Sequence, residues 1–302
     1  MSKIAFVYPG QGAQKKDMGK DFFDNQSFDV ASDYLGIDVK KNIIEGSNKL
    51  NQTKYTQASM LAVEIAITDE ILKRGIKPDI AAGLSLGEYA AIYVAGGIEF
   101  EDALKVTALR GELMEEAVPY GTGTMTAVLG LTKDKVEVAI ESVEDIWIAN
   151  FNTDKQIIIT GKKTRMDDAI LSLKNQGAKM CRELNVSGPF HSPLLNKAGE
   201  ELRLCLNHVK FNELKIPYVS NVTGDLVDNR DDIKELLMLQ VSNPVKWVQS
   251  IKRMLSQGVD TFVEIGPSKT LTNMIKKISN DVNIYNVETL ADLEELRSKL
   301  YA

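Results

Sequence analysis

The chain has 302 residues, of which 44% are hydrophobic and 26% charged, so it can bury one large core or one core with a smaller companion. Its formal net charge of -6 argues against non-specific nucleic-acid binding, which needs a basic face. No apolar run approaches the roughly 18 residues that span a membrane. We therefore expect a soluble, cytoplasmic protein that binds neither membrane nor nucleic acid.

The N-terminal third alternates between short apolar runs and helical patterns. The run IAFVY, residues 4–8, predicts a first strand and is too short for the core of a signal peptide. Residues 57–75 carry apolar side chains at helical spacing, residues 78–83 predict a short strand, and residues 86–97 predict a short helix. This alternation favours an α/β fold in which helices pack on a mainly parallel sheet.

The pattern changes near Pro119, and from there to about Ser187 it indicates strand, helix, strand, strand, helix, strand. That order is the ferredoxin-like arrangement. Thr164 and Asp167 stand at capping-box-like spacing where its second helix opens. We therefore predict a small ferredoxin-like domain inserted into a large α/β-hydrolase-like domain. The small domain takes residues 122–187, and the large one takes residues 1–121 and 188–302.

After this insertion the pattern returns to the large domain. Ser192 and Pro193 predict the N-cap and the first position of a further helix, and residues 261–266 predict a strand. The two cysteines, Cys181 and Cys205, have neither metal-ligand spacing nor the arrangement of a disulfide framework. We expect both to fill the core in a reduced protein that holds no metal.

Ser85 is the first candidate for chemistry, because it occupies the centre of Gly-x-Ser-x-Gly in AAGLSLGEYAA. A sharp turn from strand to helix projects such a serine hydroxyl away from its own backbone. The N–H of the following residue then points toward the oxyanion that forms. The pattern alone is common, but the strand predicted before it and the helix predicted after it favour a nucleophile.

A serine hydroxyl is a poor nucleophile without a base, and the chain has two histidines. His208 follows a helix end, where interaction with the helix dipole is the simpler interpretation. His191 lies in SGPFHSP, a loop bounded by glycine and proline at the seam between the two domains. It is either a cap for the next helix or the partner that Ser85 needs, and we predict the pair Ser85–His191.

The loop YPGQGAQ, residues 8–14, fits neither common phosphate-binding template. No Gly-Lys-Ser/Thr follows it, and it lacks the third glycine of the dinucleotide fingerprint. Two interpretations stay open. The segment is an ordinary turn after the first strand, or its backbone N–H at Gln11 supplies a second donor to an oxyanion.

Arg110 shares one helical face with Val106 and Leu113. An arginine on an apolar stripe either extends its guanidinium to solvent or holds a buried anion. If it is buried, its planar fork suits a carboxylate, which it can bind through two parallel hydrogen bonds.

Seven segments together, in this order and at these spacings, closely resemble the malonyl-CoA:acyl carrier protein transacylases of fatty acid synthesis. They extend from residue 4 to about residue 275 and are YPGQGAQ, GLSLGEYAA, LRGELMEEAVPYGTGTM, NFNTDKQIIITG, GPFHSPLL, LQVSNPVKW and EIGPSKTL. Acyltransferase domains of polyketide synthases and of multidomain fatty acid synthases share most of these segments.

The resemblance implies roles for individual catalytic residues. Ser85 would be the nucleophile that becomes malonylated, and His191 would be its base. The backbone carbonyl of Gln240 would orient the histidine, which explains why no Asp completes a conventional triad. The N–H groups of Gln11 and Leu86 would form the oxyanion hole.

The resemblance also implies residues that bind the substrate. Arg110 would pair with the free carboxylate of the malonyl group, and Phe190 would disfavour a branched methylmalonyl chain. Met125 and Asn152 would line the cleft from the small domain. Two departures stand out, because Leu84 replaces a common histidine and NFNTDKQ lacks the usual proline after its second asparagine.

By resemblance, the chain would carry a malonyl group from malonyl-CoA to the phosphopantetheine thiol of acyl carrier protein, with no bound cofactor. Acyl carrier proteins are acidic, so docking needs a local basic patch. Lys269, Lys276 and Lys277 are candidates for it, although the default interpretation is that they are solvated surface lysines. We expect a monomer, while the sequence leaves the oligomeric state open.

Three rival functions are open at this stage. A trans-acting malonyl acyltransferase of a polyketide synthase would have the same motifs and differ in its carrier protein. A serine esterase or thioesterase would share Gly-x-Ser-x-Gly but place its histidine near the C-terminus, whereas about a third of this chain follows His208. A non-catalytic interaction protein would have no need of Ser85, His191 and Arg110 together.

Overall fold

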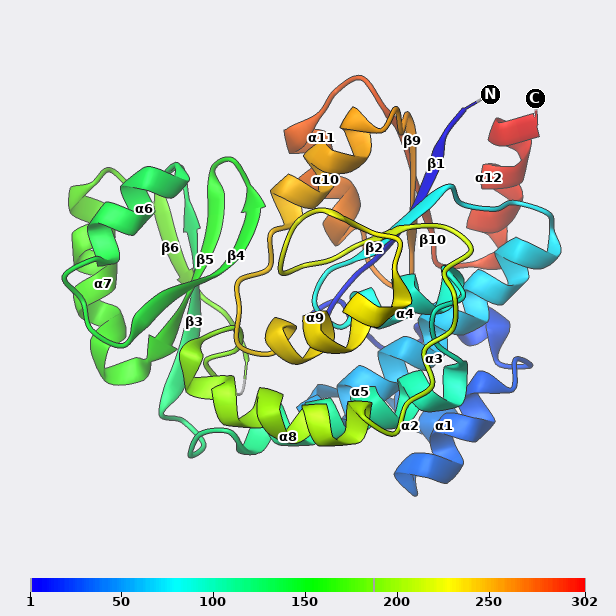
Figure 1. Ribbon diagram of the computed structural model, residues 1–302, viewed down its shortest axis with the longest axis horizontal. Helices are drawn as coiled ribbons and strands as arrows, with labels where there is room; N and C mark the ends of the chain where they lie inside the picture. The colour runs from blue at the N-terminus through cyan, green and yellow to red at the C-terminus, as the bar shows by residue number, and fades with distance from the viewer. Residues whose placement is uncertain (1, 187, 302) are drawn as a thin grey trace.

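The computed structural model describes residues 2–186 and 188–301, and contains two separate sheets (Figure 1). The larger sheet has the strand order β10-β9-β1-β2-β7-β8. All its neighbouring pairs are parallel except β7 and β8, so the expectation of a mainly parallel sheet is confirmed. Its strands are β1 (Ile4–Tyr8), β2 (Ile80–Gly83), β7 (Tyr218–Val219), β8 (Leu226–Val227), β9 (Thr261–Ile265) and β10 (Asn283–Val287).

Helices cover both faces of this sheet. The side chains of its strand β1 accordingly alternate between two apolar clusters, one on each face. Phe6 and Tyr8 of β1 point into one cluster, and Ala5 and Val7 point into the other. The helices of this unit are α1 (Ser27–Leu35), α2 (Val39–Glu45), α3 (Thr53–Lys73), α4 (Gly87–Val94), α5 (Phe100–Glu116), α8 (Asn196–Leu206), α9 (Ile233–Gln240), α10 (Trp247–Ser256), α11 (Thr270–Ile278) and α12 (Leu290–Tyr301).

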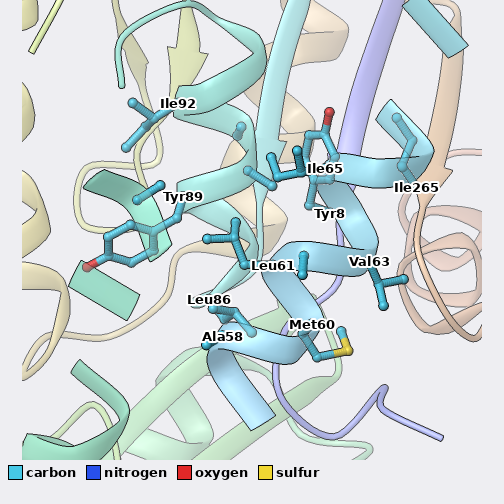
Figure 2. Packing of buried hydrophobic residues seen from close by; sticks show 14 of the residues in the cluster. Tyr8, Ala58, Met60, Leu61, Val63, Ile65, Leu86, Tyr89, Ile92 and Ile265 are labelled. Atoms are coloured by element: carbon cyan, nitrogen blue, oxygen red, sulfur yellow. The ribbon is translucent and has the colours of Figure 1, made fainter. Parts of the chain in front are cut away.

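The helix α3 lies in the middle of the larger cluster. Every residue from Thr56 to Thr68 is buried, so this helix is enclosed on all sides rather than amphipathic. Figure 2 shows its side chains Leu61 and Ile65 among Tyr8 of β1 and side chains of α4. This packing fixes β1, α3 and α4 relative to one another, and the candidate site is built on the same three elements.

The smaller unit has the element order expected from its sequence. It consists of β3 (Gly123–Leu129), α6 (Lys133–Ile140), β4 (Ile146–Thr153), β5 (Gln156–Lys162), α7 (Lys163–Asn175) and β6 (Met180–Glu183). Its sheet is antiparallel with the order β4-β5-β3-β6, and its helices lie on one face (Figure 1). Val245 joins it to the larger unit, because its N–H donates to Ala149 O at 2.8 Å and its carbonyl accepts from Phe151 N at 2.9 Å.

Several local expectations were wrong. The helix α7 begins at Lys163, so Thr164 and Asp167 stand inside the helix and form no capping box. Ser192 and Pro193 do stand at the N-cap and the first position, as expected, but of a short 3-10 turn that leads into α8. The Ser192 hydroxyl donates to Pro189 O at 2.7 Å instead of accepting from a helix N–H. Both cysteines are free and only half-buried, at the margins of the apolar clusters rather than inside them.

Two negative observations apply to the part of the chain that the structure describes. Within residues 2–186 and 188–301, no helix is long and apolar enough to cross a membrane. In the same ranges, no group of three or more His, Cys, Asp or Glu side chains is placed to hold a metal ion. Ser187, where we expect the small domain to end, lies outside the described residues.

Candidate active site

Ser85 lies in the turn that joins β2 to α4, with a left-handed backbone φ of 56°. The glycines on either side are there because the chain folds back tightly on itself. A Cβ atom on Gly83 would come within 1.9 Å of the carbonyl carbon of Gly87. A Cβ atom on Gly87 would come within 2.3 Å of Tyr8 O. The expected turn from strand to helix is therefore present, and side chains larger than hydrogen are sterically excluded from it.

Asn221, in the loop after β7, clamps this turn from the side. Its Oδ1 accepts from the Ser85 N–H at 2.6 Å, and its Nδ2 donates to Gly83 O at 2.6 Å. These two bonds hold both sides of a residue whose φ is unfavourable for a side chain with a Cβ. Asn221 was not among the residues predicted from the sequence, because one asparagine in a loop has no distinctive local pattern.

His191 lies beside the serine, so the predicted pair is brought together. Its Nε2 is 2.8 Å from Ser85 Oγ, and its Nδ1 is 2.9 Å from the backbone carbonyl of Gln240. A carbonyl only accepts, so Nδ1 carries the proton and Nε2 presents its lone pair to the serine. Burial, together with the nearby charge of Arg110, lowers the pKa of His191 to about 4. His208 is exposed just beyond α8.

Arg110, on α5, is 1% exposed, so its guanidinium is buried rather than extended to solvent. One terminal nitrogen donates to Gln57 Oε1 at 2.7 Å. The other donates to Ser85 Oγ and to Gln240 Oε1, each at 2.9 Å. A cation thus lies in direct contact with the candidate nucleophile, where a carboxylate on an acyl group would reach it.

Glu88 and the side chain of Gln240 complete the buried polar network. The Gln240 amide nitrogen donates to Ser85 O at 2.9 Å and to Glu88 Oε2 at 2.6 Å. The same carboxylate oxygen accepts from the Asn221 N–H at 3.2 Å. Burial raises the pKa of Glu88 to about 7. Glu88 was not predicted from the sequence, although a carboxylate directly after the Gly-x-Ser-x-Gly motif, among apolar residues, was a usable signal.

A cavity of about 390 Å³ opens beside Ser85 and His191, between the two units. Met125 and Asn152 line it from the small unit, and Gln11 and Phe190 line it from the large one. Asn152 is 5% exposed, and its Oδ1 has no hydrogen-bond partner among the described residues. The expected cleft residues are therefore assembled at one place.

Five further positions singled out in the sequence have distinct surroundings. Leu84 lines the cavity and lies against Gly10, where an added Cβ atom would come within 2.4 Å of Leu84 O. The side chain of Leu86 is buried in the core, which leaves its backbone N–H as the group for the site. The lysines proposed for docking are exposed on or beside α11, whose residues Leu271 and Met274 line the cavity; these lysines are Lys269, Lys276 and Lys277.

Comparisons with known proteins show the family to which the chain belongs. A family model described as an acyl transferase domain matches residues 5–294. The chain is 38% identical over 289 residues to the malonyl CoA-acyl carrier protein transacylase of Bacillus subtilis (strain 168), covering 92% of this chain and 91% of that protein. It is 37% identical over 304 residues to the protein of the same name from Staphylococcus aureus (strain COL), covering 97% and 98%.

Solved structures are similar over nearly the whole chain. The malonyl CoA-acyl carrier protein transacylase of Clostridium perfringens superposes with a TM-score of 0.94 at 40% identity, covering 99% of this chain and 97% of that one. A malonyl-transacylase in complex with its type II polyketide synthase acyl-carrier protein superposes with a TM-score of 0.95 at 35% identity, covering 99% and 100%.

Proposed function

The chain belongs to the acyl transferase domain family, and from this membership we propose that it transfers a malonyl group from malonyl-CoA to acyl carrier protein. The acceptor is the thiol of the carrier's phosphopantetheine arm, and the product supplies fatty acid synthesis. The observation that supports this most is the buried Arg110 guanidinium, 2.9 Å from Ser85 Oγ. A fixed cation beside the nucleophile selects an acyl group that ends in a carboxylate.

The reaction proceeds in two acyl transfers through Ser85. His191 removes the hydroxyl proton, and Ser85 Oγ attacks the thioester carbonyl of malonyl-CoA. The oxyanion faces the N–H groups of Gln11 and Leu86, and CoA leaves as a thiol with the proton from His191. The carrier thiol then enters the same cavity and reverses these steps. Loss of one oxyanion donor would cost about 3 to 4 kcal/mol, or two to three orders of magnitude in rate.

The buried arginine also favours transfer over hydrolysis. An esterase or thioesterase passes its acyl group to water and has no use for a fixed cation that retains a charged acyl group. Phe190, in the cavity wall beside His191, disfavours a methyl branch next to the thioester. Leu84 adds no polar group to the site, but it leaves the nucleophile, the base and the oxyanion donors in place.

Carrier choice separates our proposal from its nearest alternative. One of the similar structures is a complex with a polyketide synthase carrier, so a trans-acting malonyl acyltransferase is the second candidate. We propose that an acidic carrier docks near Lys269, Lys276 and Lys277. No bound cofactor takes part in either version. Relative rates with fatty acid and polyketide holo carriers would distinguish the two.

We also propose the boundaries and folds of the two domains, the oligomeric state and the cellular location. The large unit, residues 1–121 and 188–302, is α/β-hydrolase-like, and the small unit, residues 122–187, is ferredoxin-like, as supported by its strand order. The protein is a cytoplasmic monomer that binds neither nucleic acid nor membrane. The mixed surface charge and the free cysteines support this setting.

The function is tested by comparing two acyl donors in an Arg110→Ala variant. Removal of two charge-assisted hydrogen bonds to the malonyl carboxylate lowers malonyl transfer by about 100-fold or more. Acetyl transfer, which has no carboxylate to lose, falls far less. Arg203→Ala is the matched control, because Arg203 pairs with Glu200 on an exposed helix face. Equal losses with both donors would remove the role that we assign to Arg110.

A further inference from the structure

Two buried charges lie behind the nucleophile without touching each other. Arg110 and Glu88 are 1% and 0% exposed, respectively. The Gln240 side chain bridges them, because its Oε1 accepts from Arg110 at 2.9 Å and its Nε2 donates to Glu88 at 2.6 Å. Burial of a single charge is costly unless an opposite charge or hydrogen bonds compensate it. When Glu88 is ionised, this bridged pair therefore places two opposite charges on either side of Gln240, and together they carry no net charge.

Glu88 faces charged and titratable groups from three elements. Arg110 comes from α5 and is the cation, Tyr218 comes from β7, and Tyr89 is on its own helix α4. The α9 helix contributes the uncharged Gln240. Burial raises the pKa of both tyrosines, so they stay neutral at physiological pH. Arg110 is thus the charge to which Glu88 responds.

The proposed substrate brings a second carboxylate to this cation. Two anions would then surround one buried guanidinium, and like charges in a low-dielectric interior strongly disfavour joint ionisation. We propose that Glu88 is the counter-ion of Arg110 in the free enzyme. When the malonyl carboxylate binds Arg110 and becomes its counter-ion instead, Glu88 takes up a proton. This inference rests on the proposed function.

The proton balance of the acylation step is then complete. The Ser85 hydroxyl proton goes to His191 and from there to the CoA sulfur, while the Ser85–acyl bond forms and the thioester bond breaks. The proton that neutralises Glu88 comes from solvent. Above about pH 7, where Glu88 is ionised in the free enzyme, malonylation therefore consumes up to one proton that acetylation does not. Because the pKa of Glu88 is about 7 before substrate binds, the coupling falls within the working pH range.

The test measures the second-order rate constant for malonyl-enzyme formation at sub-saturating malonyl-CoA, which reports the ionisation of the free enzyme. It is compared between about pH 6 and pH 9 in wild type and in Glu88→Gln. Glutamine keeps an oxygen that accepts from Gln240 and Asn221 but has no charge. The pKa of His191, about 4, keeps this base neutral throughout. We expect the wild-type rate with malonyl-CoA to fall up to about tenfold per pH unit above about pH 7. The rate with acetyl-CoA stays flat, and the variant is flat with both donors.

Three outcomes separate the explanations. The same decline in wild type and Glu88→Gln, or the same decline with acetyl-CoA, would overturn the counter-ion role. No malonyl adduct at any pH would instead refute the proposed function. Glu99→Gln is the matched control, since Glu99 is exposed and accepts from Asn212, and its profile follows wild type.

A second measurement needs no variant at Glu88. Calorimetry of wild type in buffers of different ionisation enthalpy counts the protons taken up during single-turnover acylation at about pH 8. Subtraction of the acetyl-CoA value removes the contribution of the released thiol. We expect an excess of about one proton per malonyl group. An excess of zero would overturn the inference even if Glu88→Gln failed to fold.

Discussion

Replacement of Asn221 by alanine tests how the serine is held in position. The side chain makes two bonds of 2.6 Å, one from the Ser85 N–H and one to Gly83 O. Alanine leaves both backbone groups without these partners in a largely enclosed turn. Each unsatisfied group costs about 1 to 3 kcal/mol, so the free energy of unfolding should fall by about 2 to 6 kcal/mol. Ser85 also loses the restraint on its left-handed φ of 56°.

Urea unfolding and the burst of acyl-enzyme formation measure the two consequences of this change. We expect Asn221→Ala to lose at least about tenfold in acylation rate, because the hydroxyl is no longer held toward His191. Asn212→Ala is the control, since its exposed amide bonds to Glu99 and its loss should change stability by less than about 0.5 kcal/mol. If Asn221→Ala matched this control in both stability and rate, the turn would hold Ser85 without the asparagine.

Three further predictions follow from the same structure. Gly87→Ala should prevent acyl-enzyme formation, as measured by intact mass, because its Cβ would lie 2.3 Å from Tyr8 O; normal labelling would contradict the steric argument. Acylation should fall about tenfold per pH unit below about 4, where His191 becomes protonated, and a decline centred near 6.5 would refute the buried, uncharged base. Glu64 is buried with neither oxygen paired among the described residues, and burial raises its pKa well above 4.5. The free energy of unfolding should therefore fall as the pH rises above 4.5, by up to about 1.4 kcal/mol per pH unit, because the unfolded chain ionises Glu64 and the folded chain does not. Urea unfolding of Glu64→Gln should lack this part of the pH dependence. The same pH dependence in wild type and variant would contradict the assignment to Glu64.

Much of the fold could be predicted from the sequence because its signals are local. The run from Ile4 to Tyr8 is apolar on both strand faces, as a central parallel strand requires. The small unit alternates strands and helices in a recognisable order. The capping box at Thr164 failed, because the spacing of two side chains does not fix where a helix begins, and α7 starts directly after β5.

The candidate site was predictable only where chemistry leaves a motif. Ser85 has such a motif, and the small number of histidines points to His191. For Arg110, periodicity identified a helix face but could not say what packs on it. Asn221 and Glu88 act through partners more than 130 residues apart in the chain, so only the folded structure brings them together. For Gln240, the resemblance implied a role for the backbone carbonyl. The structure shows in addition that its side chain bridges Arg110 and Glu88.

Intact-protein mass after brief mixing with malonyl-CoA, without any carrier protein, tests our central claim most directly. We predict one malonyl adduct on the peptide that contains Ser85, absent from Ser85→Ala and discharged by holo acyl carrier protein. Steady release of CoA without an adduct would contradict transfer and indicate a hydrolase. An adduct that persists in Ser85→Ala would contradict the assignment of the nucleophile.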